Sequence, residues 1–263
     1  MKSTGKILRY QLRDVIRGRW ILVYTLVFLL MTDVLFRFGG SGERVVLSLM
    51  NVVLLLVPLV SIIFGTMYLY HAREFIVLLL AQPVDRTSLF LGLYGGMAIP
   101  LAGSYAVGVG LPFLWHAGGG GGGGSALGVL LLTGVLLTCA FTALAFLVAV
   151  LFEDRAKGFG AAVLVWLLAA VVYDGVILIV VTSLWRYPLE RPLLVLTMLN
   201  PIDLGRVFLL LQFDIAALMG YTGAVFSRFF GSAVGKGLAL TVLVAWSVVP
   251  LLVGLRRFRM KDF

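Results

Sequence analysis

Long apolar runs alternate along the chain with short connections that hold most of the charged residues. A helix needs about 20 apolar residues to cross a hydrocarbon core of roughly 30 Å, so each run predicts one membrane span. Pro58 and Pro100 lie within the over-long second and third runs, where they favour kinks or tilt. We therefore predict an all-α polytopic membrane protein with one transmembrane domain over residues 1–263. The six predicted spans cover residues 20–36, 45–70, 89–115, 126–152, 159–184 and 238–255.

Composition agrees with a chain whose solvent is the bilayer. Hydrophobic residues make up 61% of the chain, charged residues 13%, and the mean hydropathy is +1.09. These values exclude an ordinary soluble domain. The first run follows positive charge, as in a signal peptide, but residues 31–34 offer no small-residue cleavage site, so we expect a retained span. Cys139 is the only cysteine, which excludes an internal disulfide.

Basic residues predict the orientation, because they favour the cytoplasmic side of short connections. If both termini are cytoplasmic, most of the 21 Lys and Arg residues fall in inner segments. The net charge of +9 is then an orientation signal and an attraction to anionic lipid. No basic surface large enough to follow a phosphate backbone remains once the helices are in the membrane, so we expect no nucleic-acid partner.

Two inner segments are expected to form helices at the membrane surface. Residues 4–19 place basic side chains on one helical stripe and apolar side chains opposite, which predicts an N-terminal interfacial helix; an ordinary positive flank is the alternative. In the loop 71–88, the apolar centre Phe75–Ala81 is too short to cross a bilayer and is bracketed by charge. It predicts a short cytoplasmic helix ended by Pro83, which either caps the bundle or docks a partner.

The long outer segment before the last span carries a helix-start signal. Asn200 followed by Pro201 is typical of an N-cap and first turn, Asp203 suits the helix dipole, and Arg206 is a possible partner for it. Apolar positions at helical spacing follow, so amphipathic helices are expected to rest on or dip into the outer leaflet. Taken alone, this signal is more simply explained as a purely structural helix start. The glycine run 118–124 predicts a flexible linker without a site.

The sequence predicts no catalytic, cofactor or metal site. The stretch 231–237 lacks the spacing and the hydroxyl of a phosphate-binding loop. His71 and His116 fall on opposite sides of the membrane, and the methionines are dispersed. Asp174 lies near the middle of the fifth predicted span, where an ionisable group is costly and must face the bundle, a cavity or a partner. An interhelical anchor is favoured over a proton relay, since no second buried ionisable group is evident beside it.

Two elements carry a resemblance to known families. The stretch EFIVLLLAQPVDR, from Glu74 to Arg86, resembles the coupling segment of type-2 ABC transporter permeases, although Phe75 and Ile76 replace the usual glycine and threonine. The second element is Tyr173-Asp174 followed by LNPIDLGRVFLL at 199–210. It resembles the permease subunits of transporters that mature the copper site of nitrous oxide reductase.

The resemblance implies a non-catalytic subunit in a bacterial inner membrane, with both termini cytoplasmic. Implied partners are a second copy of the chain, a cytoplasmic ABC ATPase that uses ATP and Mg, and a periplasmic copper-handling β-helix protein. One alternative keeps the fold and exports a lipid, drug or polysaccharide. Another is a proton-coupled carrier or intramembrane enzyme centred on Asp174. The residues implied in coupling to the ATPase are Arg73, Glu74, Phe75, Leu78, Leu79, Pro83 and Arg86.

Overall fold

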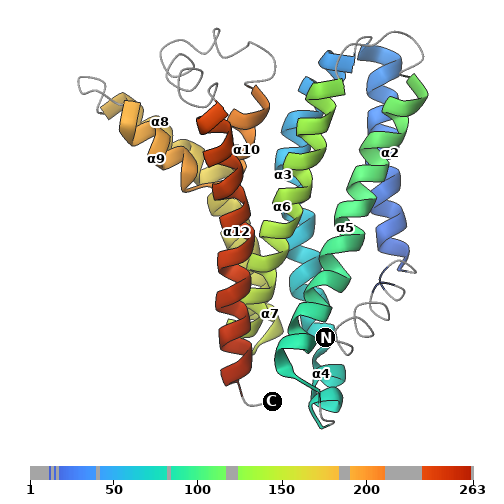
Figure 1. The fold of residues 1–263 in the computed structure, drawn as a ribbon, viewed down its shortest axis with the longest axis vertical. Coiled ribbons are helices and arrows are strands. Elements are labelled where there is room, and N and C mark those ends of the chain that lie inside the picture. The colour runs from blue at the N-terminus through green and yellow to red at the C-terminus, as the bar shows by residue number, and fades with distance from the viewer. Residues whose placement is uncertain are drawn as a thin grey trace.

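The computed structural model is a bundle of long helices (Figure 1). It describes residues 18–39, 42–81, 84–116, 124–183, 190–210 and 233–261, together with Leu12 and Val15. Within these residues every element is helical, and six helices are long and apolar enough to cross a membrane. This confirms the prediction of an all-α polytopic membrane protein. The charged stripe of the expected N-terminal helix, Pro83 and most of the glycine run lie outside the described residues.

The observed spans are longer than the sequence predicted. The prediction stopped near the first charge, whereas the spans other than α6 continue into the charged residues that flank the apolar runs. Pro58 lies inside α3, and Pro100 inside α5, without ending either helix. The spans are α2 (Arg19–Gly39), α3 (Gly42–His71), α5 (Arg86–His116), α6 (Gly124–Leu151), the composite of α7 (Arg155–Leu167), η2 (Leu168–Val172) and α8 (Tyr173–Ser183), and α12 (Ala233–Met260).

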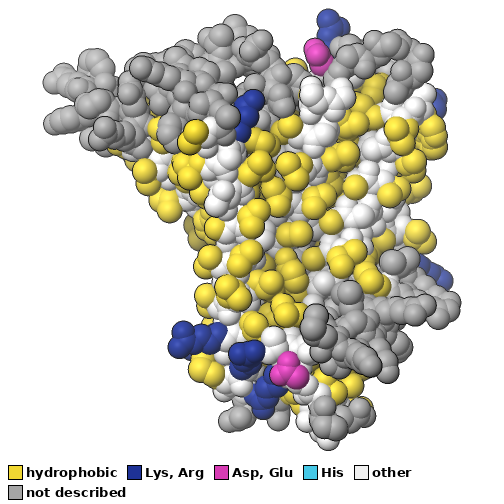
Figure 2. All heavy atoms as spheres, in the orientation of Figure 1, with side chains coloured by type: hydrophobic (Ala, Val, Ile, Leu, Met, Phe, Trp, Pro, Cys, Tyr) yellow, Lys and Arg dark blue, Asp and Glu magenta, His cyan; other side chains and the backbone are white. Residues whose placement is uncertain are grey.

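The core centres on α6, which packs against α3, α5, α10 (Pro201–Leu210) and α12. It is the most buried of the six spans, whereas the composite α7–α8 span is the least buried. Figure 2 shows one face of the bundle covered by apolar side chains, with Lys and Arg gathered at the end where α12 finishes. The same end carries the short helix α4 (Arg73–Leu80) and is called the α4 end below (Figure 1).

Close approach of helices in the core depends on small residues. Gly134 of α6 faces the ring of buried Tyr105, whose hydroxyl donates to the Leu130 carbonyl at 2.8 Å. A Cβ at position 134 would overlap that ring. Because the ring is buried and held by its hydrogen bond, it cannot move aside without cost.

We expect Gly134→Ala to destabilise the protein by about 1–3 kcal/mol through this overpacking. The measurement is the loss of the monodisperse peak after heating in detergent. Gly128→Ala is the matched control, because Gly128 lies on the same helix and has open space where a Cβ would point. Equal melting of the two variants would contradict the packing argument.

The fifth span changes character part-way along its length. A π turn, η2, separates α7 from α8, and α8 then leans away from the bundle together with α9 (Glu190–Met198) (Figure 1). α9 and α10 meet at an angle of 111°, as in a broken span or a re-entrant loop. α10, one of the expected amphipathic helices, packs into the bundle: Leu204, Val207 and Phe208 are buried there.

Candidate functional site

Two polar regions lie at opposite ends of the bundle, and α4 forms the first. The sequence predicted a short helix here, and α4 is that helix. Ile76 is 1% exposed and packs into the core, while Leu79 is partly buried against it. Val77 and Leu78 are 49% and 66% exposed. The outward ridge of α4 is therefore formed by Val77 and Leu78, flanked by the exposed side chain of Glu74.

The two arginines expected to take part in coupling turn toward the bundle. Arg73 donates to the carbonyls of Phe152 at 2.9 Å, Ala149 at 3.3 Å and Glu153. Arg86 donates from Nη1 to the carbonyls of Arg259 and Lys261, both at 2.8 Å. The structure thus places both guanidinium groups on the ends of transmembrane helices. Glu74 and Leu78 are exposed, and Phe75 is partly buried.

The connection from α6 to α7 is an organised junction. Asp154 caps α7 by accepting a hydrogen bond from the backbone N–H of Lys157 at 2.9 Å. This hydrogen bond is the main reason that the pKa of Asp154 lies below its usual range. The hydroxyl of Tyr70 donates to the carbonyl of Phe152 at 2.9 Å, which ties α3 to the same junction. The segment is exposed in part, yet its backbone is held by neighbouring helices.

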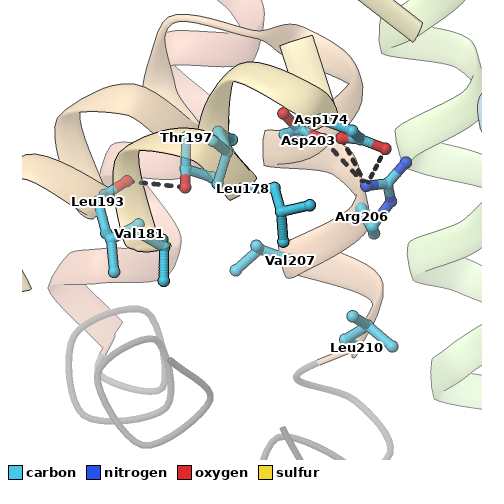
Figure 3. Close-up of a pocket in the computed structure, with 10 residues that line it drawn as sticks. Asp174, Leu178, Val181, Leu193, Thr197, Asp203, Arg206, Val207 and Leu210 are labelled. Atoms are coloured by element: carbon cyan, nitrogen blue, oxygen red, sulfur yellow. Dashed lines mark hydrogen bonds and ion pairs between the residues drawn. The ribbon is translucent and has the colours of Figure 1, made fainter. Parts of the chain in front are cut away.

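The second polar region joins α8 to α10 and is shown in Figure 3. Arg206 Nη1 donates to both carboxylate oxygens of Asp174, each at 3.0 Å, and to Oδ1 of Asp203 at 3.2 Å. Asp203 is the i−3 partner that the sequence predicted, whereas the contact to Asp174 crosses 32 positions. We call Asp174, Asp203 and Arg206 the ion cluster. It carries two carboxylates and one guanidinium.

Asn200 positions this cluster from the start of α10. Its Oδ1 accepts from the backbone N–H of Ile202 at 3.1 Å, which confirms the expected N-cap. Its Nδ2 donates to Asp203 Oδ2 at 3.0 Å and to the Ala169 carbonyl at 2.7 Å. Ala169 lies in the π turn, where the wider helix disturbs the regular hydrogen-bond ladder. One side chain thus ties the π turn, the cap and the ion cluster together.

At the break between α9 and α10, side chains donate hydrogen bonds to backbone carbonyls of α9. The hydroxyl of Tyr173 donates to the Leu196 carbonyl at 2.6 Å, and Trp246 Nε1 donates to the Met198 carbonyl at 3.2 Å. Carbonyls at a helix C-terminus lack intrahelical donors, and irregular backbone at membrane depth is tolerated only where protein supplies them. Tyr173 and Trp246 come from two different spans, so the break is built into the bundle.

The ion cluster lies at one end of a cavity of about 320 Å³ between α8, α9 and α10 (Figure 3). Leu178, Val181 and Leu193 contribute to its largely apolar wall. The side chain of Asp203 is only 7% exposed, compared with 31% for Arg206 and 42% for Asp174. The cavity thus combines an apolar wall with an accessible charged end.

One expectation about Asp174 is wrong. A second buried ionisable group does accompany it, because the α9–α10 reversal brings Asp203 and Arg206 to its side. Asp174 lies 19 residues, and therefore roughly 28 Å along the helix axis, from Arg155 at the start of this span. The signal that could have revealed the cluster is a lone aspartate in an apolar span together with an arginine on the amphipathic helix that follows.

Other ionisable groups at the α10 end form local contacts. Arg37 Nε donates to Asp33, four residues earlier in the same helix, at 2.8 Å, and His116 approaches the same carboxylate at 3.8 Å. Among the residues that the structure describes, no three His, Cys, Asp or Glu side chains are grouped to hold a metal ion.

Comparison with known proteins gives two relatives over most of the chain. The probable ABC transporter permease protein NosY of Pseudomonas aeruginosa is 28% identical over 236 residues, covering 84% of this chain and 86% of the relative. The protein of the same name from Stutzerimonas stutzeri is 27% identical over 277 residues, covering 98% and 99%. No protein-family model matches the chain.

In its six apolar spans and its relatives, the chain is similar to multi-pass ABC transporter permeases. Within that class its resemblance is to the NosY permeases, which confirms the resemblance seen at residues 173–174 and 199–210.

Proposed function

We propose that the chain is the transmembrane subunit of an ATP-driven complex that serves maturation of the copper site of nitrous oxide reductase. An ABC permease implies a membrane setting and an ATPase partner. The proposed complex contains two copies of this chain, two copies of a separate ATPase that binds ATP and Mg, and a periplasmic copper-handling β-helix protein. It lies in the inner membrane, with the α4 end in the cytoplasm.

The ion cluster is the observation that carries this proposal. Asp174 and Arg206 come from the two separate sequence elements on which the narrow resemblance rests, and the two side chains bind each other. The two sequence elements that resemble one family thus also contact each other in the structure. This supports the nitrous oxide reductase assignment over a chance match of short stretches.

In the proposed mechanism, the chain itself performs no chemistry. Closure of the ATPase subunits on ATP displaces α4, and the displacement shifts the packing of the spans. The outward ridge of Val77 and Leu78 suits this contact, because it is apolar, exposed and at the end rich in Lys and Arg. Motion then reaches the α10 end, where the periplasmic partner binds.

We expect Leu78→Asp to weaken ATPase docking by roughly tenfold or more, because it replaces an apolar contact with a charge. The measurement is copurification of the ATPase and the ATP-dependent activity of the complex. Leu78 is a sharper target than Leu79, whose partial burial would mix docking with packing. Leu114→Asp is the matched control, because Leu114 is 73% exposed near the far end of α5. Unchanged docking in Leu78→Asp would contradict this role for α4.

Deletion of the gene tests the biological role. The expected result is nitrous oxide reductase that reaches the periplasm but lacks its copper-site absorption and activity, with both restored by the wild-type gene. Fully loaded reductase in the deletion strain would overturn the assignment and leave the permease class standing.

The cavity beside the ion cluster favours one alternative, export of an amphiphile. Its volume falls near the lower end of small-molecule pockets, and it joins an apolar wall to a charged end. Under this alternative, a lipid or drug stimulates ATP hydrolysis in nanodiscs, and Val181→Trp removes the stimulation by filling the cavity. Neither effect is expected if the complex only transmits motion to a periplasmic partner.

A further inference from the structure

We propose that Arg73 and Arg86 carry the movement of α4 to the ends of α6 and α12, acting as positioning residues rather than as contacts to the ATPase. This inference rests on the proposed docking of the ATPase at α4. In this inference Arg73 transmits the movement to α6, and Arg86 transmits it to α12.

Arg73 grips the end of α6. Its guanidinium reaches the Ala149 carbonyl in the last turn and the Phe152 and Glu153 carbonyls just beyond it. Carbonyls at a helix C-terminus have no intrahelical donors and carry the negative end of the helix dipole. The guanidinium also lies 4.4 Å from the centre of the Tyr70 ring, a cation–π contact that limits its freedom.

Arg86 donates hydrogen bonds to the end of α12 in the same way. It stands at the first position of α5, where the chain returns from α4, and its Nη1 reaches the Arg259 and Lys261 carbonyls. Arg259 in turn donates to the Thr87 hydroxyl from Nε at 2.9 Å. The end of α12 is therefore held from both directions by the beginning of α5.

Lys261 connects the end of α12 to the end of α6. Its ammonium donates to the Val150 carbonyl of α6 at 3.2 Å and lies 3.6 Å from the Glu153 carboxylate. Ile76 of α4 lines a small space together with Phe258 and Lys261, so the buried side of α4 meets the same junction. We call Arg73, Arg86 and Lys261 the α4-end clamp.

The clamp is suited to transmitting displacement. The acceptors of both arginines are backbone carbonyls, so the arginines hold the helix axes and not flexible side chains. A guanidinium fork is planar and keeps its direction better than a lysine ammonium. α6 also packs against α10, which bears two residues of the ion cluster, so a shift of α6 can reach the α10 end. A pathway of this kind requires evidence of coupling, which a spectroscopic signal supplies.

The test uses the complete complex of permease and ATPase in nanodiscs. Cys139→Ser removes the only cysteine, and Val234→Cys then places an environment-sensitive fluorophore at an 81% exposed position at the far end of α12. In the otherwise wild-type chain, trapping with ATP and vanadate is expected to shift the emission. In Arg73→Gln/Arg86→Gln most of that shift is expected to be lost. Arg257→Gln is the matched control, because Arg257 is an exposed arginine at the same end of α12.

A separate Leu78→Cys crosslink to the ATPase distinguishes a failure of docking at α4 from a failure of the arginines to transmit movement. If Leu78→Cys permease with both arginines intact gives no crosslink, docking at α4 is wrong. If the crosslink is retained and the arginine variants keep the full emission shift, the clamp is only structural and the inference is overturned. The absence of any shift at Val234→Cys in the otherwise wild-type complex overturns it as well.

Lysine variants decide the question if the double glutamine variant does not assemble. Arg73→Lys and Arg86→Lys keep the positive charge at the helix ends but lose the fork. Each is expected to retain assembly and to lose part of the emission shift. Full shifts in both lysine variants would overturn the inference.

Discussion

Arg206→Gln should be among the most damaging single substitutions at the α10 end, costing about 2–4 kcal/mol of stability. Arg206 is the cation that pairs with Asp174 and Asp203 in the ion cluster, at 3.0 and 3.2 Å. Removing it leaves two carboxylates together, one of which, Asp203, is only 7% exposed. The expected loss lies below that of a fully buried pair, because Arg206 and Asp174 are partly accessible to water. Thermal unfolding in detergent measures the effect.

Two further variants isolate the electrostatic cause. Asp203→Asn combined with Arg206→Gln removes the unpaired buried charge, so the double variant is expected to be more stable than Arg206→Gln alone. Arg37→Gln is the matched control, because Arg37 also pairs with an aspartate, at 2.8 Å, but its side chain is 70% exposed. An exposed pair contributes about 0–1 kcal/mol, so this variant is expected to melt close to wild type. Similar losses in Arg37→Gln and Arg206→Gln would mean that burial is not the cause.

The spans could be predicted because each one satisfies its own backbone hydrogen bonds and needs only apolar length. The helix ends were less predictable: α3 begins at Gly42 and α12 ends at Met260, since polar residues at the boundary remain helical in the structure. The π turn was not predicted at all. Residues 168–172 are apolar, so their periodicity does not distinguish a π turn from an α-helix.

Only part of the ion cluster could be predicted from the sequence. Asp203 and Arg206 lie three positions apart on one helix, and that pairing was predicted. Their contact with Asp174 depends on the sharp reversal between α9 and α10, which has no local signature. At the α4 end, the inward direction of Arg73 and Arg86 was equally hidden. Their acceptors are backbone carbonyls, and any residue supplies a carbonyl, so the sequence could not reveal them.

Asp174→Asn and Asp174→Leu are expected to have different effects, and the difference separates an anchor from a proton carrier. Asn keeps the shape and one acceptor oxygen for Arg206, which also remains paired with Asp203. We therefore expect Asn to cost about 1 kcal/mol or less and to leave the complex active. Leu removes both hydrogen bonds that join α8 to α10, at an expected cost of about 1.5–3 kcal/mol and with weaker assembly.

Assembly and ATP-dependent activity, measured on both variants, decide between the two roles. An anchor requires that activity follow assembly, so Asn remains near wild type and Leu loses both together. A proton carrier requires a group that can bind and release a proton, which an amide cannot do, so Asn would abolish activity in a fully assembled complex. The ion cluster makes that second outcome physically accessible, because Asp203 is a nearby carboxylate and Asp174 is 42% exposed beside the cavity. An inactive but intact Asn complex would therefore overturn the anchor role and assign proton coupling to this end of the bundle.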